Sequence, residues 1–73
     1  RLEREEAEIL SRMEALEAEK TALETEIARP EVYSDGARVT AVQAKLDAAA
    51  RGIDTATETW ERIAAELETA RRA

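Results

Sequence analysis

Apolar side chains recur at intervals of seven in the first part of the chain, at Leu2, Ile9, Leu16 and Leu23. A second series with the same interval begins four residues later and comprises Glu6, Met13, Lys20 and Ile27. Together the two series form the d and a positions of a heptad repeat, which is typical of a helix that packs against another helix. We therefore predict a helix over residues 2–29, with a seam that contains two charged members and is widened by Leu10.

The second part of the chain keeps a stricter repeat. Apolar residues alternate at spacings of three and four without a break, at Val39, Val42, Leu46, Ala49, Ile53, Ala56, Trp60, Ile63, Leu67 and Ala70. A straight helix with 3.6 residues per turn drifts away from a 3.5-residue repeat over such a length. The pattern predicts a helix over 37–71 with a partner helix along its full length.

Residues 30–36 separate the two repeats and predict a reversal of the chain. Pro30 disfavours helical backbone at Arg29, so the first helix should end there. Ser34 or Asp35 is expected to cap the second helix by accepting hydrogen bonds from its first amide groups.

The short turn makes the two helices antiparallel neighbours. The predicted fold class is thus all-α, a two-helix antiparallel coiled-coil hairpin that forms a single domain over 1–73. Val32 and Tyr33 are apolar residues within this polar turn. We expect both to fold over the end of the seam, near Ile27 and Val39.

A single register satisfies both repeats. It pairs every a position with a d position: Ile27 with Val42, Leu23 with Leu46, Lys20 with Ala49, Leu16 with Ile53, Met13 with Ala56, Ile9 with Trp60, Glu6 with Ile63 and Leu2 with Leu67. Small residues then face long ones, as close packing requires. Trp60 is expected in the core, against Ile9.

Two further predictions concern ion pairs beside the seam and the glycine in the second helix. Glu19 and Glu26 should lie within reach of Lys45, and Glu26 also within reach of Arg38, so that ion pairs link the two helices. Gly52 lies in the middle of a helix, where it costs about 1 kcal/mol relative to alanine. We expect it to face solvent, with a bend or a close approach by a binding partner as the alternatives.

The amino-acid composition is typical of long helices and also bears on the cellular location of the domain. Of the 73 residues, 38% are charged, and there is no phenylalanine and only one tyrosine and one tryptophan. Cysteine is absent, so no disulfide can form, and no apolar run of about 18 residues could span a membrane. No signal peptide is recognisable, and Arg1 stands where a complete chain would have methionine. We expect a cytoplasmic domain cut from a longer polypeptide.

The side chains needed for most enzymatic chemistry are missing. The chain has no histidine, no cysteine and only two isolated glycines, which excludes nucleophile–base pairs and phosphate-binding loops. The acidic cluster Glu3, Glu5 and Glu6 is expected to be a solvated helix face rather than a metal site. We predict no catalytic residue, no metal site and no cofactor within this domain.

The distribution of charge along the chain bears on whether the domain binds nucleic acid. The net charge is −6, and residues 1–29 hold five basic and nine acidic side chains, whereas residues 38–73 hold six of each. Strong non-specific binding to nucleic acid normally needs a basic surface. The acidic balance opposes such binding but leaves a local contact open.

Three features together resemble a known family: a heptad helix that ends in Pro30-Glu31-Val32-Tyr33-Ser34-Asp35, a second heptad helix, and Trp60-Glu61 near its end. This combination is similar to the C-terminal coiled-coil domain of ABC-F ATPases, in particular the Uup type. The resemblance implies the tail of a cytoplasmic protein with two ATP-binding cassettes, where ATP and magnesium are bound, and no membrane domain. It further implies an association with ribosomes and translation, and DNA binding by the tail.

Candidate contacts for DNA or ribosomal RNA are few, and they are Arg29, Tyr33, Arg38, Lys45, Arg71 and Arg72. Three of the basic residues lie towards the turn and two at the C-terminus. For each of them, the alternative is a solubilising surface charge. The tyrosine could stack on a base or, as expected above, cover the end of the seam.

Two other functions stay open. One is a structural or protein-interaction hairpin that docks on its own ATPase domains or pairs with a second copy, so that the isolated domain is a monomer or a weak homodimer. The other is a helical arm of a different translation protein, such as a release factor or an aminoacyl-tRNA synthetase. The pair Trp60-Glu61 favours the ABC-F resemblance over this last alternative.

Overall fold

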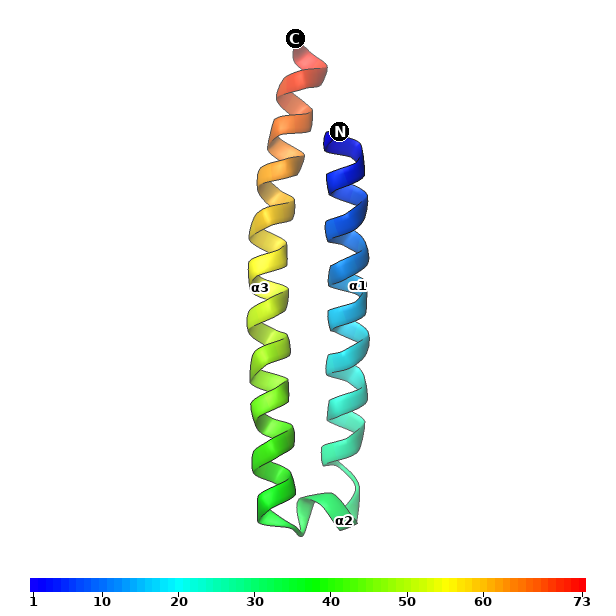
Figure 1. Cartoon of the computed structure of the whole chain (residues 1–73), viewed down its shortest axis with the longest axis vertical. Coiled ribbons are helices and arrows are strands. Elements are labelled where there is room, and N and C mark those ends of the chain that lie inside the picture. Colours follow the sequence, from blue (N-terminus) through cyan, green and yellow to red (C-terminus); the bar gives the residue numbers. More distant parts are fainter.

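The computed structural model describes all residues from Arg1 to Ala73, and it contains three helices and no strand. They are α1 (Leu2–Ile27), α2 (Pro30–Tyr33) and α3 (Gly36–Arg72), as Figure 1 shows. The all-α prediction is confirmed. The expected count of two helices is corrected to three, because the turn that joins the long helices is itself helical.

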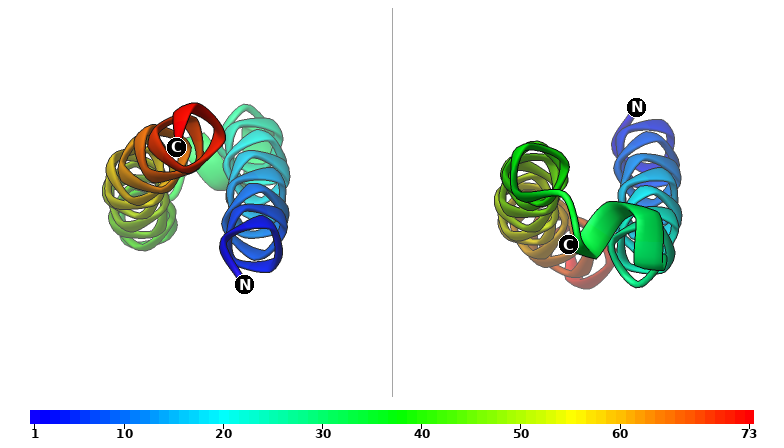
Figure 2. Two further views of the ribbon diagram at one scale, coloured as in Figure 1. Left: turned by 90° about the horizontal axis from the view of Figure 1, so that it is seen from above. Right: turned by 90° about the horizontal axis from the view of Figure 1, so that it is seen from below.

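The long helices α1 and α3 lie side by side and run in opposite directions in a rod of 58 × 14 × 14 Å (Figure 1). The turn lies at one end, and the N- and C-termini lie towards the other. Seen along the rod in Figure 2, the two helices wind around each other in the left-handed sense. This is the supercoil that a 3.5-residue apolar repeat imposes on helices with 3.6 residues per turn.

The end of α1 follows from Pro30. Arg29 has φ −73° and ψ 133°, an extended conformation that a following proline favours. The helix ends at Ile27, two residues before the predicted end. Pro30 then occupies the first helical position of α2, where its missing amide hydrogen costs nothing and its fixed φ suits a helix.

The single turn of α2 places two neighbouring residues in opposite environments. Val32 is 5% exposed and packs with Leu23 and Val42 in the hydrophobic cluster at this end of the rod. Tyr33 is 60% exposed. The expectation that both residues cover the seam is therefore right for Val32 and wrong for Tyr33, because consecutive side chains on a helix point about 100° apart.

Asp35 caps the start of α3. Its Oδ1 accepts hydrogen bonds from the amide groups of Ala37 at 3.1 Å and Arg38 at 3.3 Å. These amides have no carbonyl partner in the first turn, so the cap satisfies them. Ser34, the other capping candidate, instead donates its hydroxyl to the carbonyl of Pro30. Helix α3 spans 36–72, one residue longer at each end than the predicted 37–71.

The predicted seam is the interior of the rod. Every seam position is buried or half-buried except Ala70, including the two charged residues Glu6 and Lys20. The most enclosed residues are Ala49 and Ala56, at 3% and 2% exposure. The residues most enclosed between the helices are thus small side chains on α3. Trp60 is half-buried, and its indole Nε1 is enclosed without a hydrogen-bond partner.

Gly52 faces α1 rather than solvent, so the expectation for this residue was wrong. A β-carbon at Gly52 would lie 3.2 Å from Cδ2 and 3.3 Å from Cδ1 of Leu16. The predicted register pairs Leu16 with Ile53, the neighbour of Gly52, and the contact agrees with it. Leu46 and Ile27 also pack against the cluster of Leu23 and Val42, as that register requires.

The expected ion pairs between the helices are absent. Every ion pair of the structure joins residues at most four apart in the sequence, such as Arg38 with Asp35 and Arg72 with Glu68. Glu19, Glu26 and Lys45 form none. The two long helices are therefore held together by their apolar seam, and the flanking charges are solvated.

Candidate functional site

The three basic residues predicted near the turn surround one surface hollow of about 340 Å³, which we call the turn-end hollow. The end of α1, the short helix α2 and the first turns of α3 together form its walls. Its charged lining consists of Glu26, Arg29, Glu31, Arg38 and Lys45. The sequence placed these basic residues towards the turn, and the fold brings them to a single hollow.

The basic residues of the turn-end hollow differ in their ion pairs. Arg38 Nε lies 3.8 Å from Asp35 Oδ2, on an exposed part of the surface. Arg29 and Lys45 have no carboxylate within ion-pair distance. These two side chains can therefore bind an external anion without first breaking an internal pair.

Tyr33 is not part of the lining of the turn-end hollow. It follows Glu31 and Val32 on α2, and both of these residues line the hollow. With 60% of its surface exposed, Tyr33 is the most exposed large apolar residue of the rod. An exposed aromatic ring of this kind is available to stack on a planar group.

The other predicted basic residues do not join this site. Arg71 and Arg72 lie in the last turn of α3, at the opposite end of a rod 58 Å long. Both pair with Glu68, at 3.9 Å from Arg71 and 3.2 Å from Arg72. The structure thus separates the six candidates into a turn-end group of four and a terminal pair of arginines that share one carboxylate, that of Glu68.

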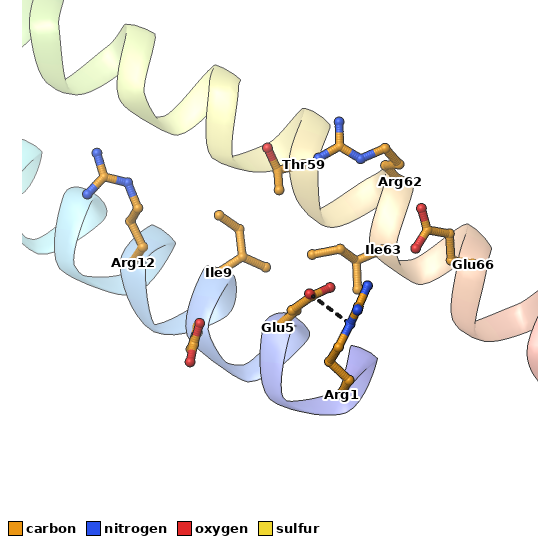
Figure 3. A pocket seen from close by; sticks show the side chains of 9 residues that line it. Arg1, Glu5, Ile9, Arg12, Thr59, Arg62, Ile63 and Glu66 are labelled. Atoms are coloured by element: carbon orange, nitrogen blue, oxygen red, sulfur yellow. Dashed lines mark ion pairs between the residues drawn. The ribbon is translucent and has the colours of Figure 1, made fainter.

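A second and larger hollow of about 520 Å³ lies near the free end of the rod, and sequence reasoning missed it. We call it the free-end hollow. Figure 3 shows Ile9 of α1 and Ile63 of α3 directed towards each other between the helices. Around them stand Arg1, Glu5, Glu8, Arg12, Thr59, Arg62 and Glu66. The available signal was Thr59, a short side chain at a flanking position of the heptad, which leaves space beside the seam.

The charge of the rod is concentrated in its middle, which we call the shaft (residues 13–25 and 46–58). The shaft holds seven acidic and two basic side chains, so it carries most of the net charge of −6. Residues 26–45, which form the turn end, hold three acidic and three basic side chains. The two ends are thus close to neutral, while the shaft repels anions.

Comparisons with known proteins identify the kind of domain. The family model described as the ABC transporter C-terminal domain matches residues 1–69. Neither the curated proteins nor the solved structures provide a match. In addition, none of the helices has both the length and the apolar character needed to cross a membrane.

Proposed function

This chain belongs to the ABC transporter C-terminal domain family, and we propose that it is the C-terminal arm of a Uup-like ABC-F ATPase that contacts nucleic acid or the ribosome with its turn end. The match agrees with the resemblance carried by the turn motif and by Trp60-Glu61. It also favours an ABC protein over a release factor or a synthetase as the parent.

The observation that carries the proposed contact is the grouping of basic residues at the turn-end hollow. Arg29 and Lys45 have no internal ion pair there, and Tyr33 is exposed on α2, the short helix that also contributes residues to the hollow. Unpaired arginine and lysine side chains bind phosphate, and an exposed aromatic ring stacks on an unpaired base. A structured RNA or a DNA branch offers both groups together.

The acidic shaft supports contact through the end of the rod rather than along its side. Phosphates that approach the shaft meet an excess of carboxylates, whereas those at the turn end do not. The rod should therefore meet a nucleic acid with its tip. In this proposal the arm is cytoplasmic and catalyses nothing itself, while ATP and magnesium are bound by the ATPase domains of the parent protein.

The experiment that tests this function measures binding of the arm to branched DNA and to structured RNA at two salt concentrations. Phosphate recognition predicts that the logarithm of the affinity falls with the logarithm of the salt concentration, with a slope of about −0.9 for each phosphate contact on a duplex. Binding that is undetectable at low salt, or insensitive to salt, would rule out the proposed contact.

A second candidate is a protein-interaction hairpin without nucleic-acid binding. The net charge of −6 favours it, since a polyanion is repelled by most of the rod. Family membership makes the ATPase domains of its own polypeptide the natural partner. The same binding experiment distinguishes the two candidates, because this one predicts no affinity for either nucleic acid.

A further inference from the structure

The free-end hollow has features that suit a protein surface. Ile9 and Ile63 provide an apolar floor where the two long helices face each other (Figure 3). Ile9 and Thr59 are half-buried, whereas Ile63 is 6% exposed, so Ile9 supplies most of the accessible part of the floor. A hollow of about 520 Å³ is large enough to receive an apolar side chain from a partner.

The charges around this floor are balanced and only partly paired. Arg1 Nε lies 3.5 Å from Glu5 Oε1, the ion pair drawn in Figure 3. The other charged lining residues have no ion pair, and they are Glu8, Arg12, Arg62 and Glu66. Two free cations and two free anions match a surface that itself carries both signs. A protein provides such a surface, whereas a nucleic acid provides phosphates only.

The position of the hollow indicates which protein would occupy it. In the proposed parent protein the ATPase domains precede this C-terminal domain, so they join it at the end of the rod where α1 begins, which is also the end that carries the hollow. The body to which the arm is attached therefore lies at this end of the rod. Because the ATPase domain is covalently joined to the arm, its effective concentration at the hollow would be high. Even an interface of modest affinity would then be occupied.

We propose that the free-end hollow is the docking surface for the ATPase domain of the same polypeptide. An apolar side chain of that domain rests on the half-buried Ile9, above the buried Ile63, and its charged neighbours pair with Arg12, Arg62, Glu8 or Glu66. This contact fixes the free end of the rod on the ATPase domain. The turn end is therefore held at a defined distance and direction from that domain. This inference rests on family membership and not on nucleic-acid binding.

Photo-crosslinking in the full-length parent protein tests the docking. A photoreactive amino acid replaces Glu66, which is exposed and lines the hollow, or Asp47, which is exposed on α3 but lies in the shaft. We expect crosslinks to peptides of the ATPase domain from position 66 and not from position 47. Adding Arg62→Glu should lower the yield from position 66 by about tenfold, since a favourable charge contact becomes a repulsive one.

The controls separate docking from misfolding and from nucleic-acid contact. Arg51→Glu makes the same charge change on an exposed shaft residue and should leave the yield unchanged. Helix content and nucleic-acid affinity should be unaltered by Arg62→Glu, because the turn end is remote from it. Equal yields from positions 66 and 47, or crosslinks to a second copy of the arm instead of the ATPase domain, would overturn the proposal whether or not the turn end binds nucleic acid.

Discussion

The methyl groups of Leu16 lie against the backbone of Gly52, so close that an added β-carbon would be 3.2 Å from the nearer one. This contact joins the middle of α1 to the middle of α3. Contacts of this length are tighter than ordinary van der Waals separation, so a side chain at position 52 would displace Leu16 or separate the helices. The glycine is therefore part of the packing between the helices, despite its cost within a helix.

Gly52→Val should destabilise the hairpin. Helix propensity alone favours valine over glycine by about 0.4 kcal/mol, but overpacking against Leu16 should cost about 1–3 kcal/mol, and the packing term wins. The measurement is the free energy of unfolding from urea titration followed by circular dichroism. Ala48→Val is the control, because Ala48 is exposed on the same helix and should lose only about 0.6 kcal/mol. A Gly52→Val variant more stable than the parent would show that Leu16 yields freely.

Asp35→Ala should remove the cap of α3. The carboxylate accepts hydrogen bonds from the amides of Ala37 and Arg38, so its loss should lower the free energy of unfolding by about 1 kcal/mol. Asp35→Asn keeps an acceptor oxygen and should retain most of the stability. Ser34→Ala is the matched control, since Ser34 does not cap α3. Thermal unfolding of the three variants in parallel checks the order, and an equal loss in Ser34→Ala would argue against the cap.

Val32→Ala should lower the free energy of unfolding more than Tyr33→Ala, because only Val32 is buried. Val32 is 5% exposed, and removing two buried carbons should cost about 1.5 kcal/mol. Tyr33 is 60% exposed, so its truncation should cost less than about 0.5 kcal/mol. Nucleic-acid affinity should respond in the opposite order if Tyr33 stacks on a base. Unfolding and binding curves of the same two variants test both statements.

Arg29→Gln and Lys45→Gln should each weaken binding to structured RNA or branched DNA. Removing one phosphate contact should reduce the salt slope by about 1, and the double variant should lose about twice as much. Arg71→Gln together with Arg72→Gln is the control, because these residues pair with Glu68 at the other end of the rod. A loss of affinity in the control as large as that in the turn-end variants would place the contact elsewhere.

Neutralising the shaft should allow nucleic acid to bind along the side of the rod as well as at its turn end. Replacement of Glu17, Glu24 and Asp47, all exposed, by their amides removes three negative charges from the shaft. We expect non-specific affinity for duplex DNA at low salt to rise by about tenfold as the repulsion falls. Binding to the preferred branched or structured ligand should change less. Electrophoretic mobility shifts with the two kinds of ligand measure the ratio, and an unchanged ratio would contradict the role assigned to the shaft.

The sequence by itself determined which residues form the interior. Seven-residue spacing identified the seam on both helices, including the half-buried Glu6 and Lys20, because periodicity reports which face a helix turns towards its partner. The stop before Pro30 was also readable, and the cap of α3 was narrowed to Ser34 or Asp35, since both features depend on local backbone chemistry; the structure assigns the cap to Asp35.

Tertiary structure alone decided the features that depend on distance between the helices. No local signal showed that Gly52 meets Leu16, that the flanking charges fall short of ion pairs, or that α2 buries Val32 and exposes Tyr33. The free-end hollow belongs to the same class, because it exists only where Ile9 and Ile63 come from different helices. Periodicity determines which side of a helix faces its partner, whereas the space between two helices depends on how the side chains of both pack together.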